Sequence, residues 1–286
     1  MSRHLIRLLC LLSLSLPWLA QAAEVVLQVF HSELLNRDYR YQVYLPQGYA
    51  QQTRSYPVLY LLHGAGGDEN EWLDSIGVRQ TLDRMIEQGQ IQPMVVVMPG
   101  HPQAWWVDGA REKGESALLQ ELMPQAEGRL RILANGRTRL LAGLSAGGYG
   151  ALNLALKYTQ RFAAVALFSP AIYDPLPPQH SSAMTQQPFQ TAGRFDPQRW
   201  RSLGYTAHID AYKRSGVKLP LYIMSGDRDT YGIALQSALL YEKLRLYQPG
   251  AMALRIVDGD HEGAVWHQAL PEALLFLNAH LPNTAP

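Results

Sequence analysis

The sequence predicts an α/β fold in which a mostly parallel, eight-stranded sheet carries helices on both faces. Two observations predict it. Apolar runs of strand length alternate along the chain with longer segments of helical character, and most of these runs are nearly continuous, without interleaved polar residues. Continuous apolar strands are expected where helices bury both faces of a parallel sheet.

The expected elements follow this alternation from one end of the chain to the other. The strands are expected at 24–30, 39–45, 56–62, 94–98, 139–143, 162–168, 219–224 and 254–257. The helices are expected at 78–88, 116–130, 149–158, 206–214, 233–247 and 264–280. The first two strands precede the alternation, and we expect them to pair antiparallel at one edge of the sheet.

The first 22 residues have the pattern of a cleavable signal peptide. Arg3 and Arg7 precede a leucine-rich run at 8–19, and Ala20-Gln21-Ala22 supplies the small residues of a cleavage site. The apolar run of about a dozen residues is shorter than the ~20 that span a bilayer. We therefore expect cleavage after Ala22 and no stable membrane anchor in the mature protein.

Residues 23–286 are expected to form a single domain, because their length suits one α/β domain with a sizeable core. The signal-peptide pattern predicts that this domain is periplasmic or secreted. The one cysteine of the sequence, Cys10, would leave with the signal peptide. Disulfides would then contribute nothing to the stability of the mature chain. The 25 basic and 24 acidic residues nearly balance, which argues against nucleic acid as a partner.

A serine lies between glycines at a predicted strand-to-helix turn. The run Gly143-Leu144-Ser145-Ala146-Gly147 follows one expected strand and precedes an expected helix. So tight a turn leaves no room for a side chain two residues to either side of the serine, which explains Gly143 and Gly147. In this setting G-x-S-x-G is the nucleophile elbow of an α/β-hydrolase. Ser145 is the predicted nucleophile.

In this fold an acid and then a histidine follow the serine, each at the end of a later strand. The seventh expected strand leads into a loop with Asp227 and Asp229, of which we favour Asp229 as the acid. The eighth leads into His261, the predicted base. His267 comes six residues later instead of the four of a zinc-binding H-E-x-x-H helix, so we do not expect these histidines to share a metal.

The third expected strand ends in His63-Gly64-Ala65-Gly66-Gly67, where an α/β-hydrolase places half of its oxyanion hole. Acyl transfer develops negative charge on the former carbonyl oxygen, and backbone N–H groups aimed at that oxygen stabilise it. The backbone amides of Ala65 and Ala146 are the predicted donors. We expect His63 to brace the loop through hydrogen bonds.

Several stretches together have the pattern of one known family. They are Tyr41-Gln42-Val43-Tyr44-Leu45-Pro46, the run from Tyr56 to Gly64, Glu121-Leu122, the run from Gly143 to Leu152, and Gly259-Asp260-His261 with Trp266 five residues on. The sequence resembles, over about residues 30–280, the esterase D group of α/β-hydrolases. That group includes feruloyl, acetyl and tributyrin esterases, S-formylglutathione and siderophore esterases, and mycolyltransferases.

The resemblance implies a catalytic role for five positions. They are Ser145 as nucleophile, His261 as base, Asp229 as acid, and the amides of Ala65 and Ala146 as the oxyanion hole. Asp229 is the acid implied because the group places its aspartate three residues after the glycine that ends the strand, here Gly226. The group often has Asp-Trp after the histidine, whereas this chain has Glu262-Gly263, so we expect a different pocket wall.

Four aromatic residues are expected near the rim of the site: Trp105, Trp106, Tyr231 and Trp266. Such side chains either stack on an aryl group or sugar of the substrate or pack as ordinary rim residues. The segment 173–200 is rich in Pro, Gln and Ser and lacks periodicity. We expect it to be a surface excursion, which either closes over the substrate as a partial lid or is a passive loop.

These features predict a secreted or periplasmic serine esterase that hydrolyses small-molecule or carbohydrate esters through an acyl-enzyme intermediate. Chemistry of this kind needs no metal and no organic cofactor. Two other functions use the same residues or the same fold. An alcohol that outcompeted water would make the protein an acyltransferase, and loss of turnover would leave a catalytically inert binding protein.

Overall fold

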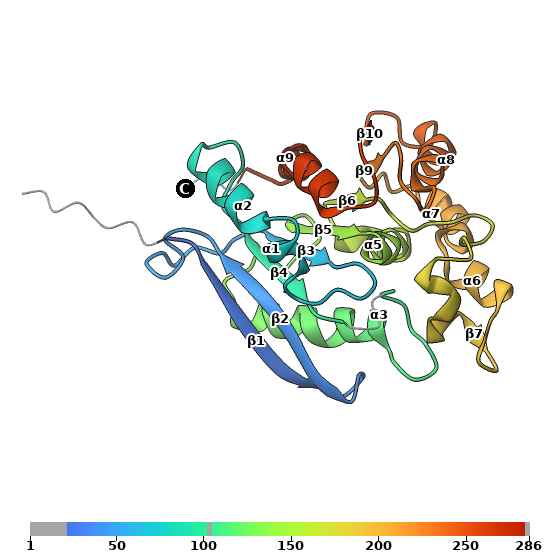
Figure 1. The fold of residues 1–286 in the computed structure, drawn as a ribbon. Helices are drawn as coiled ribbons and strands as arrows, with labels where there is room; N and C mark the ends of the chain where they lie inside the picture. Colours follow the sequence, from blue (N-terminus) through green and yellow to red (C-terminus); the bar gives the residue numbers. More distant parts are fainter. Residues whose placement is uncertain (1–21, 102–104, 284–286) are drawn as a thin grey trace, which may run out of the picture.

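The structure, a computed structural model, describes residues 22–101 and 105–283. An eight-stranded sheet with the order β1-β2-β4-β3-β5-β6-β9-β10 forms its centre (Figure 1), so the fold class and the eight strands expected from the sequence are confirmed. The strands of this sheet are β1 (Glu24–Ser32), β2 (Arg37–Leu45), β3 (Val58–Leu62), β4 (Val95–Pro99), β5 (Arg139–Leu144), β6 (Ala164–Phe168), β9 (Leu221–Gly226) and β10 (Met252–Val257).

Two antiparallel pairings lie at one edge of the sheet and the others are parallel. β1 pairs with β2, and β2 with β4, in antiparallel register, whereas β4, β3, β5, β6, β9 and β10 run parallel. Figure 1 shows β1 and β2 as a long ribbon at this edge. Because the parallel strands all end at the same side, the loops that follow β3, β5, β9 and β10 meet there.

Helices cover both faces of the sheet. They are α1 (Glu71–Asp74), α2 (Val78–Glu87), α3 (Gly114–Ser116), α4 (Met123–Arg129), α5 (Ala146–Lys157), α6 (Pro197–Leu203), α7 (Ile209–Arg214), α8 (Ile233–Arg245) and α9 (Gly263–Ala279). None of the helices in the described ranges is long and apolar enough to cross a membrane. The predicted signal peptide lies, apart from Ala22, outside the described residues.

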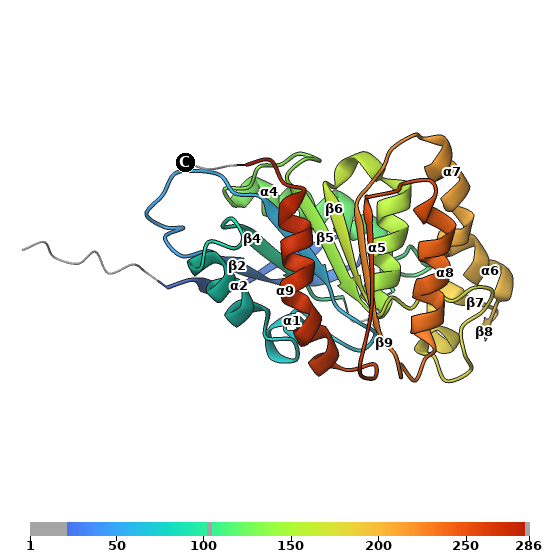
Figure 2. The same ribbon diagram turned by 90° about the horizontal axis from the view of Figure 1, so that it is seen from above.

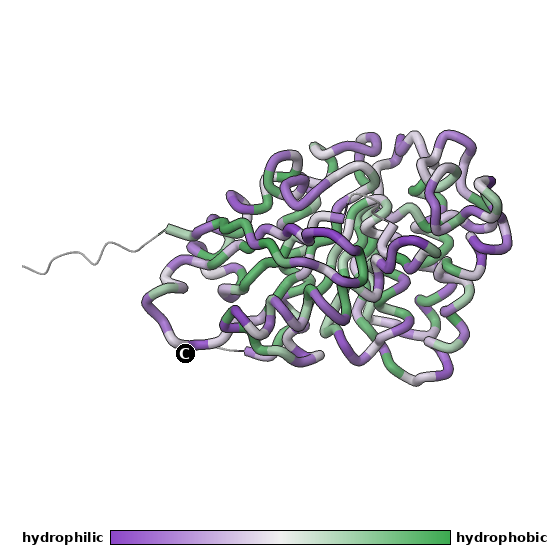
Figure 3. Tube along the Cα trace, turned by 90° about the horizontal axis from the view of Figure 1, so that it is seen from below, coloured by the Kyte–Doolittle hydropathy of each residue, from purple (hydrophilic) through white to green (hydrophobic). Residues whose placement is uncertain are grey.

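The two core layers follow from the alternation of side chains along each strand. Leu59 and Leu61 of β3 are buried with α1, α2 and α9, whereas Tyr60 and Leu62 of the same strand are buried with α4, α5 and α8. Figures 1 and 2 show α2 and α9 together over one face, and the hydropathy colours of Figure 3 place the apolar residues along the centre of the molecule. The near-continuous apolar strands are thus explained by burial on both faces.

The helix expected at 116–130 contains a π-helical turn, η1 (Ala117–Leu122), between α3 and α4. The amide of Met123 donates to the carbonyl of Leu118, five residues back, and the next residue, Pro124, has no N–H with which to restore the usual spacing. Glu121 in this turn accepts hydrogen bonds from the Ser32 hydroxyl and, at 3.1 Å, from the Leu34 amide. The irregular turn therefore ties the helix to the β1–β2 edge.

The segment 173–200, expected to be a surface excursion without periodicity, contains several short regular elements. It forms the 3₁₀ turns η3 (Ser182–Thr185) and η4 (Gln187–Phe189), the hairpin β7 (Gln190–Thr191) and β8 (Arg194–Phe195), and the start of α6. Phe189 and Trp200 are buried, and their ring centroids lie 5.2 Å and 5.8 Å from that of Trp105. The expectation of an excursion confined to the surface is therefore wrong for these aromatic side chains, which anchor the segment to the domain.

Candidate active site

Ser145 lies between β5 and α5 with a backbone φ of 53° and ψ of −117°. A residue other than glycine rarely adopts a positive φ, so the turn holds the serine in a strained conformation. A Cβ atom on Gly143 would lie 2.1 Å from the Gly147 carbonyl oxygen, and one on Gly147 would lie 2.2 Å from the Leu62 carbonyl oxygen. Both glycines are therefore required by close backbone packing, as the sequence pattern predicts.

The side chains of Ser145, His261 and Asp229 form one hydrogen-bonded chain. His261 Nε2 is 2.9 Å from Ser145 Oγ, and His261 Nδ1 is 2.8 Å from Asp229 Oδ2. The Asp229 side chain is fully buried and that of His261 is 10% exposed. With Nδ1 donating to the carboxylate, Nε2 is left free to accept the serine proton. This is the arrangement that activates a serine hydroxyl.

The parallel pairing of β9 with β10 brings the acid and the histidine together. Asp229 follows β9 and His261 follows β10. The carboxylate of Asp260 joins the two loops, because its Oδ1 accepts the His261 amide at 2.6 Å and the Thr230 amide at 2.7 Å. These two hydrogen bonds lower the pKa of Asp260. Sequence reasoning assigned no role to Asp260, although it directly precedes the predicted base.

Asp227 and His267, the two weaker candidates, lie outside this chain of contacts. Asp227 is about half exposed and accepts the Gly259 amide at 2.9 Å. The ring of His267 contacts the Ile76 carbonyl through Nδ1 at 2.7 Å. The geometry therefore places Asp229, and not Asp227, against His261, and it directs His267 to another part of the molecule.

The two amides predicted to bind an oxyanion flank the serine. Ala146 is the first residue of α5, where backbone N–H groups have no partner within the helix. Ala65 follows β3 and lines the same pocket as Ser145. In the described part of the chain neither amide donates a hydrogen bond. Both are therefore available to a ligand oxygen.

His63 braces the oxyanion loop, as expected. Its Nδ1 contacts the Gly64 carbonyl at 2.8 Å and its Nε2 accepts the His101 amide at 2.8 Å. Burial lowers the pKa of His63 to about 4. The pKa of His101 falls to about 3 because of burial and the neighbouring Arg37. Both imidazoles are therefore neutral at neutral pH and serve as fixed hydrogen-bonding groups.

A pocket of about 190 Å³ opens in front of Ser145 and His261. Its lining residues are Gly64, Ala65, Glu71, Trp105, Leu144, Ser145, Ala171, Tyr173, Ser181, Ser182, Tyr231, His261 and Trp266. Three of the four aromatic residues predicted at the rim therefore line it. The rings of Tyr231 and Trp266 lie edge-on to His261, with centroids 4.8 Å and 5.1 Å from the imidazole.

Trp106 is a correction to the predicted rim. Its side chain is buried, and its Nε1 donates to the His63 carbonyl at 3.1 Å. The backbone at Trp106 has a φ of 55°, and the indole lies 5.1 Å from the His63 ring, centroid to centroid, and does not line the pocket. Trp106 therefore supports the oxyanion loop from behind. Adjacent tryptophans in sequence cannot be assigned to rim or core without this backbone reversal.

Sequence reasoning missed four lining residues that have polar side chains. Tyr173, Ser181 and Ser182 reach the pocket from the segment 173–200, which therefore forms part of its wall. Burial, followed by the nearby charge of Asp229, raises the pKa of Tyr173. The fourth residue, Glu71, carries the one carboxylate of the lining set given above. No periodicity or motif marks these positions, because only the folding of loops far apart in sequence places them side by side.

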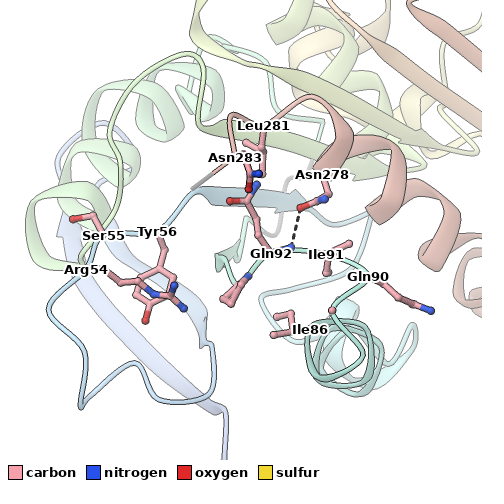
Figure 4. Close-up of a pocket in the computed structure, with 12 residues that line it drawn as sticks. Arg54, Ser55, Tyr56, Ile86, Gln90, Ile91, Gln92, Asn278, Leu281 and Asn283 are labelled. Carbon is pink, nitrogen blue, oxygen red and sulfur yellow. Dashed lines mark hydrogen bonds between the residues drawn. The ribbon is translucent and has the colours of Figure 1, made fainter. Parts of the chain in front are cut away.

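A larger cavity of about 510 Å³ lies at the opposite end of the parallel strands, next to the residues that precede β3 and β4 (Figure 4). Its lining residues include Arg54, Ser55, Gln92 and Asn278. The backbone amide of Gln92 donates a hydrogen bond to Asn278 Oδ1 at 3.0 Å. The lining set contains a serine but no histidine, aspartate or glutamate. It therefore lacks a base for that serine, and chemistry, not volume, distinguishes the pocket at Ser145.

Comparison with known proteins finds similarity to esterases. The model of the family described as "Putative esterase" matches residues 32–277. An esterase of Mycobacterium tuberculosis is 34% identical over 134 residues, which cover 44% of this chain and 28% of that protein. An endo-1,4-beta-xylanase/feruloyl esterase of Xylanibacter ruminicola is 32% identical over 155 residues, covering 51% of this chain and 21% of that protein.

The solved structure of a ferulic acid esterase superposes on this chain with a TM-score of 0.78 at 25% identity. The superposition covers 91% of this chain and 99% of that one. In contrast, the matched segments span less than a third of the Mycobacterium and Xylanibacter relatives. The likeness to those two proteins thus concerns one part of each.

Proposed function

The chain belongs to this esterase family, and we propose that it is a serine hydrolase that cleaves carboxylic esters with Ser145, His261 and Asp229. The observation that carries the proposal is the continuous hydrogen-bonded chain from the buried Asp229 carboxylate through His261 to the Ser145 hydroxyl. A histidine held in this way at the mouth of a pocket is suited to general-base catalysis at neutral pH.

In the proposed mechanism, His261 Nε2 takes the proton of Ser145 as its Oγ attacks the ester carbonyl. Negative charge then develops on the former carbonyl oxygen, where the amides of Ala65 and Ala146 donate hydrogen bonds. His261 returns the proton to the departing alcohol, which leaves an acyl-enzyme on Ser145. Water attacks the acyl-enzyme by the same route, and the products are an alcohol and a carboxylic acid.

We propose small acyl groups or a single aromatic acyl group on a carbohydrate or other small alcohol as the substrate class. The pocket is about 190 Å³ and has Trp105, Tyr173, Tyr231 and Trp266 in its lining. Aromatic walls favour a flat aryl or sugar ring by stacking. The names of the relatives, among them a feruloyl esterase and an acetyl esterase, agree with this class.

We also propose that the protein works outside the cytoplasm, in the periplasm or after secretion. The charged, apolar and small-residue pattern of residues 1–22 supports this location. Export of the full-length chain, followed by sequencing of the mature N-terminus, tests it. A mature chain that begins at Ala23 is expected, whereas a membrane-retained chain that begins at Met1 would contradict the proposal.

The hydrolytic function is tested with purified mature protein and a panel of p-nitrophenyl esters, from acetyl through longer acyl chains to feruloyl. The wild-type protein is expected to hydrolyse at least the short esters, and Ser145→Ala to lower kcat by about 10⁴-fold or more. Equal rates in the two proteins would contradict the proposal for simple esters. Product analysis with an added alcohol acceptor then separates acyl transfer from a binding function.

A further inference from the structure

Glu71 places a carboxylate in the lining of the catalytic pocket, which also contains Ser145 and His261. Resting on the proposed ester hydrolysis, we propose that Glu71 sets the charge preference of the enzyme. The pocket accepts esters that are neutral or cationic near the scissile bond and discriminates against esters that carry a negative charge there.

The position of Glu71 is held by the oxyanion loop. Glu71 begins α1 and lines the pocket that contains Ser145 and His261. Its Oε2 accepts the Gly64 amide at 2.7 Å. A Cβ atom on Gly67 would lie 2.3 Å from the same oxygen. The carboxylate is thus pressed against the turn that carries the Ala65 amide, and it cannot swing away without breaking the Gly64 contact.

No cation neutralises this carboxylate within the described part of the chain. Glu71 forms no ion pair there, and the pocket lining contains no lysine and no arginine. Its second oxygen, Oε1, accepts no hydrogen bond from the described residues and is not buried. The nearby charged groups are Asp68 and, when protonated, His261. An acceptor with an uncompensated charge therefore remains open to a ligand.

The electrostatic consequence depends on the ligand's own charge. Burial raises the pKa of Glu71, because a carboxylate away from bulk water is poorly solvated. An anionic group of a ligand bound near Glu71 would be poorly solvated too. The repulsion between that group and the Glu71 carboxylate is only weakly screened. A hydroxyl or ammonium group of a substrate could instead donate a hydrogen bond to Oε1. The pocket is therefore expected to bind neutral donors and cations more tightly than anions.

The test compares wild-type protein with Glu71→Gln, which removes the charge but keeps an oxygen that can accept the Gly64 amide. One substrate pair carries the charge on the alcohol: 4-acetoxybenzoate and the neutral 4-acetoxybenzamide. The other carries it on the acyl group: the 4-nitrophenyl esters of 4-carboxybenzoate and 4-carbamoylbenzoate. Each kcat/KM is divided by the rate of hydroxide-catalysed hydrolysis, and the readout is the neutral-to-anionic ratio of each pair at pH 8.

In at least one pair, Glu71→Gln is expected to lower this ratio by about tenfold, the effect of a unit charge several ångströms away at an intermediate dielectric constant. Glu87→Gln is the matched control, because it makes the same substitution at an exposed residue that does not line the pocket. Ratios in Glu71→Gln that equal those of wild type in both pairs would overturn the proposal, as would equal shifts in the control.

A second measurement needs no variant. Benzylammonium, benzyl alcohol and benzoate have similar shapes and differ in charge. As competitive inhibitors of the wild-type enzyme, the first two are expected to bind at least about tenfold more tightly than benzoate. Equal or tighter inhibition by benzoate would overturn the proposal. Failure of the proposed function would look different, since Ser145→Ala would then leave the hydrolysis of the neutral esters unchanged.

Discussion

Asp227 and Asp229 show how two identical side chains in one loop acquire different surroundings. Asp229 is fully buried and contacts His261, whereas Asp227 is about half exposed and accepts the Gly259 amide. A buried carboxylate can hold the imidazole in the productive tautomer and stabilise the imidazolium that forms during attack. A solvated carboxylate without that contact cannot, so the two residues are expected to differ sharply in their contribution to kcat.

The same substitution at both positions tests this difference. Asp229→Asn is expected to lower kcat by about 10³- to 10⁴-fold, because the amide favours the wrong tautomer of His261. Asp227→Asn retains an oxygen that can accept the Gly259 amide, and kcat is expected to stay within about threefold of wild type. Steady-state kinetics on p-nitrophenyl acetate measures both, and comparable losses in the two variants would contradict the assignment of Asp229.

Two buried neutral histidines make the fold sensitive to acid. The pKa of His63 is about 4 in the folded protein against 6.5 for an unperturbed histidine, and that of His101 is about 3. The unfolded chain therefore binds more protons than the folded one below about pH 6.5, and the free energy of unfolding falls as the pH decreases through this window. Each of the two histidines is expected to lower the free energy of unfolding by about 2 kcal/mol at pH 5 relative to pH 7.

The contribution of one imidazole is measured by urea unfolding of wild type and His101→Gln at pH 7 and pH 5. The variant is expected to be less stable at pH 7, because it loses packing against Trp106. Between the two pH values, however, it is expected to lose about 2 kcal/mol less than wild type. An identical pH dependence of the two proteins would show that His101 titrates normally in the folded state.

The loops that follow β9 and β10 act as one unit, because Asp260 holds the amides of both Thr230 and His261. Asp260 does not contact the serine, so it is a positioning residue. Asp260→Ala is expected to lower kcat by about tenfold with little change in KM, because His261 keeps its chemistry but loses its orientation. The measurement is steady-state kinetics on a p-nitrophenyl ester.

Asp258→Ala is the control for that variant, because Asp258 lies in the same loop and pairs with the exposed Arg228. Its loss is expected to leave kcat unchanged within about twofold. The conservative variant Asp260→Asn, which keeps an acceptor for both amides, is expected to restore most of the rate. An equal effect of the Asp258 and Asp260 alanine variants would mean that the loop needs charge in general and not this bridge.

The segment 173–200 shows why an element's role cannot be judged from composition. Its Pro- and Gln-rich sequence predicts an irregular loop, and most of it is indeed non-helical. Its buried Phe189 and Trp200 nevertheless pack with Trp105, a lining residue of the pocket, and its Ser181 and Ser182 also line that pocket. A few anchoring aromatics therefore convert a polar segment into one wall of the site.

The molecule as a whole is stabilised by burial on both faces of one sheet, without covalent cross-links in the proposed mature chain. Cys10 is the one cysteine of the sequence and precedes the proposed cleavage site. The melting temperature of the mature protein is therefore expected to change by less than about 1 °C on addition of dithiothreitol. A disulfide-bonded protein measured in parallel shows that the reductant is active. A reductant-sensitive transition would indicate that Cys10 is retained and forms intermolecular disulfides.

Patterns local in sequence were sufficient for the fold and for the candidate catalytic residues. The apolar strands predict the parallel sheet because burial on both faces leaves a continuous apolar run. Ser145 could be identified because its turn requires glycines at 143 and 147, and His261 because it follows the last strand. These inferences use local patterns of the amino-acid sequence, although the close approach of Gly147 to the Leu62 carbonyl oxygen joins segments far apart in the chain.

The tertiary structure alone decided the burial of Trp106 and the entry of Glu71 into the pocket, and it places Asp229, the acid favoured from the sequence, against His261. Asp227 and Asp229 have identical side chains and differ in the sequence only in their spacing from Gly226, and Trp105 and Trp106 are adjacent. Which member of each pair faces the site depends on backbone angles in loops and on contacts between segments far apart in the chain. Sequence periodicity carries no information about either, since loops lack the repeating geometry that gives strands and helices a predictable face.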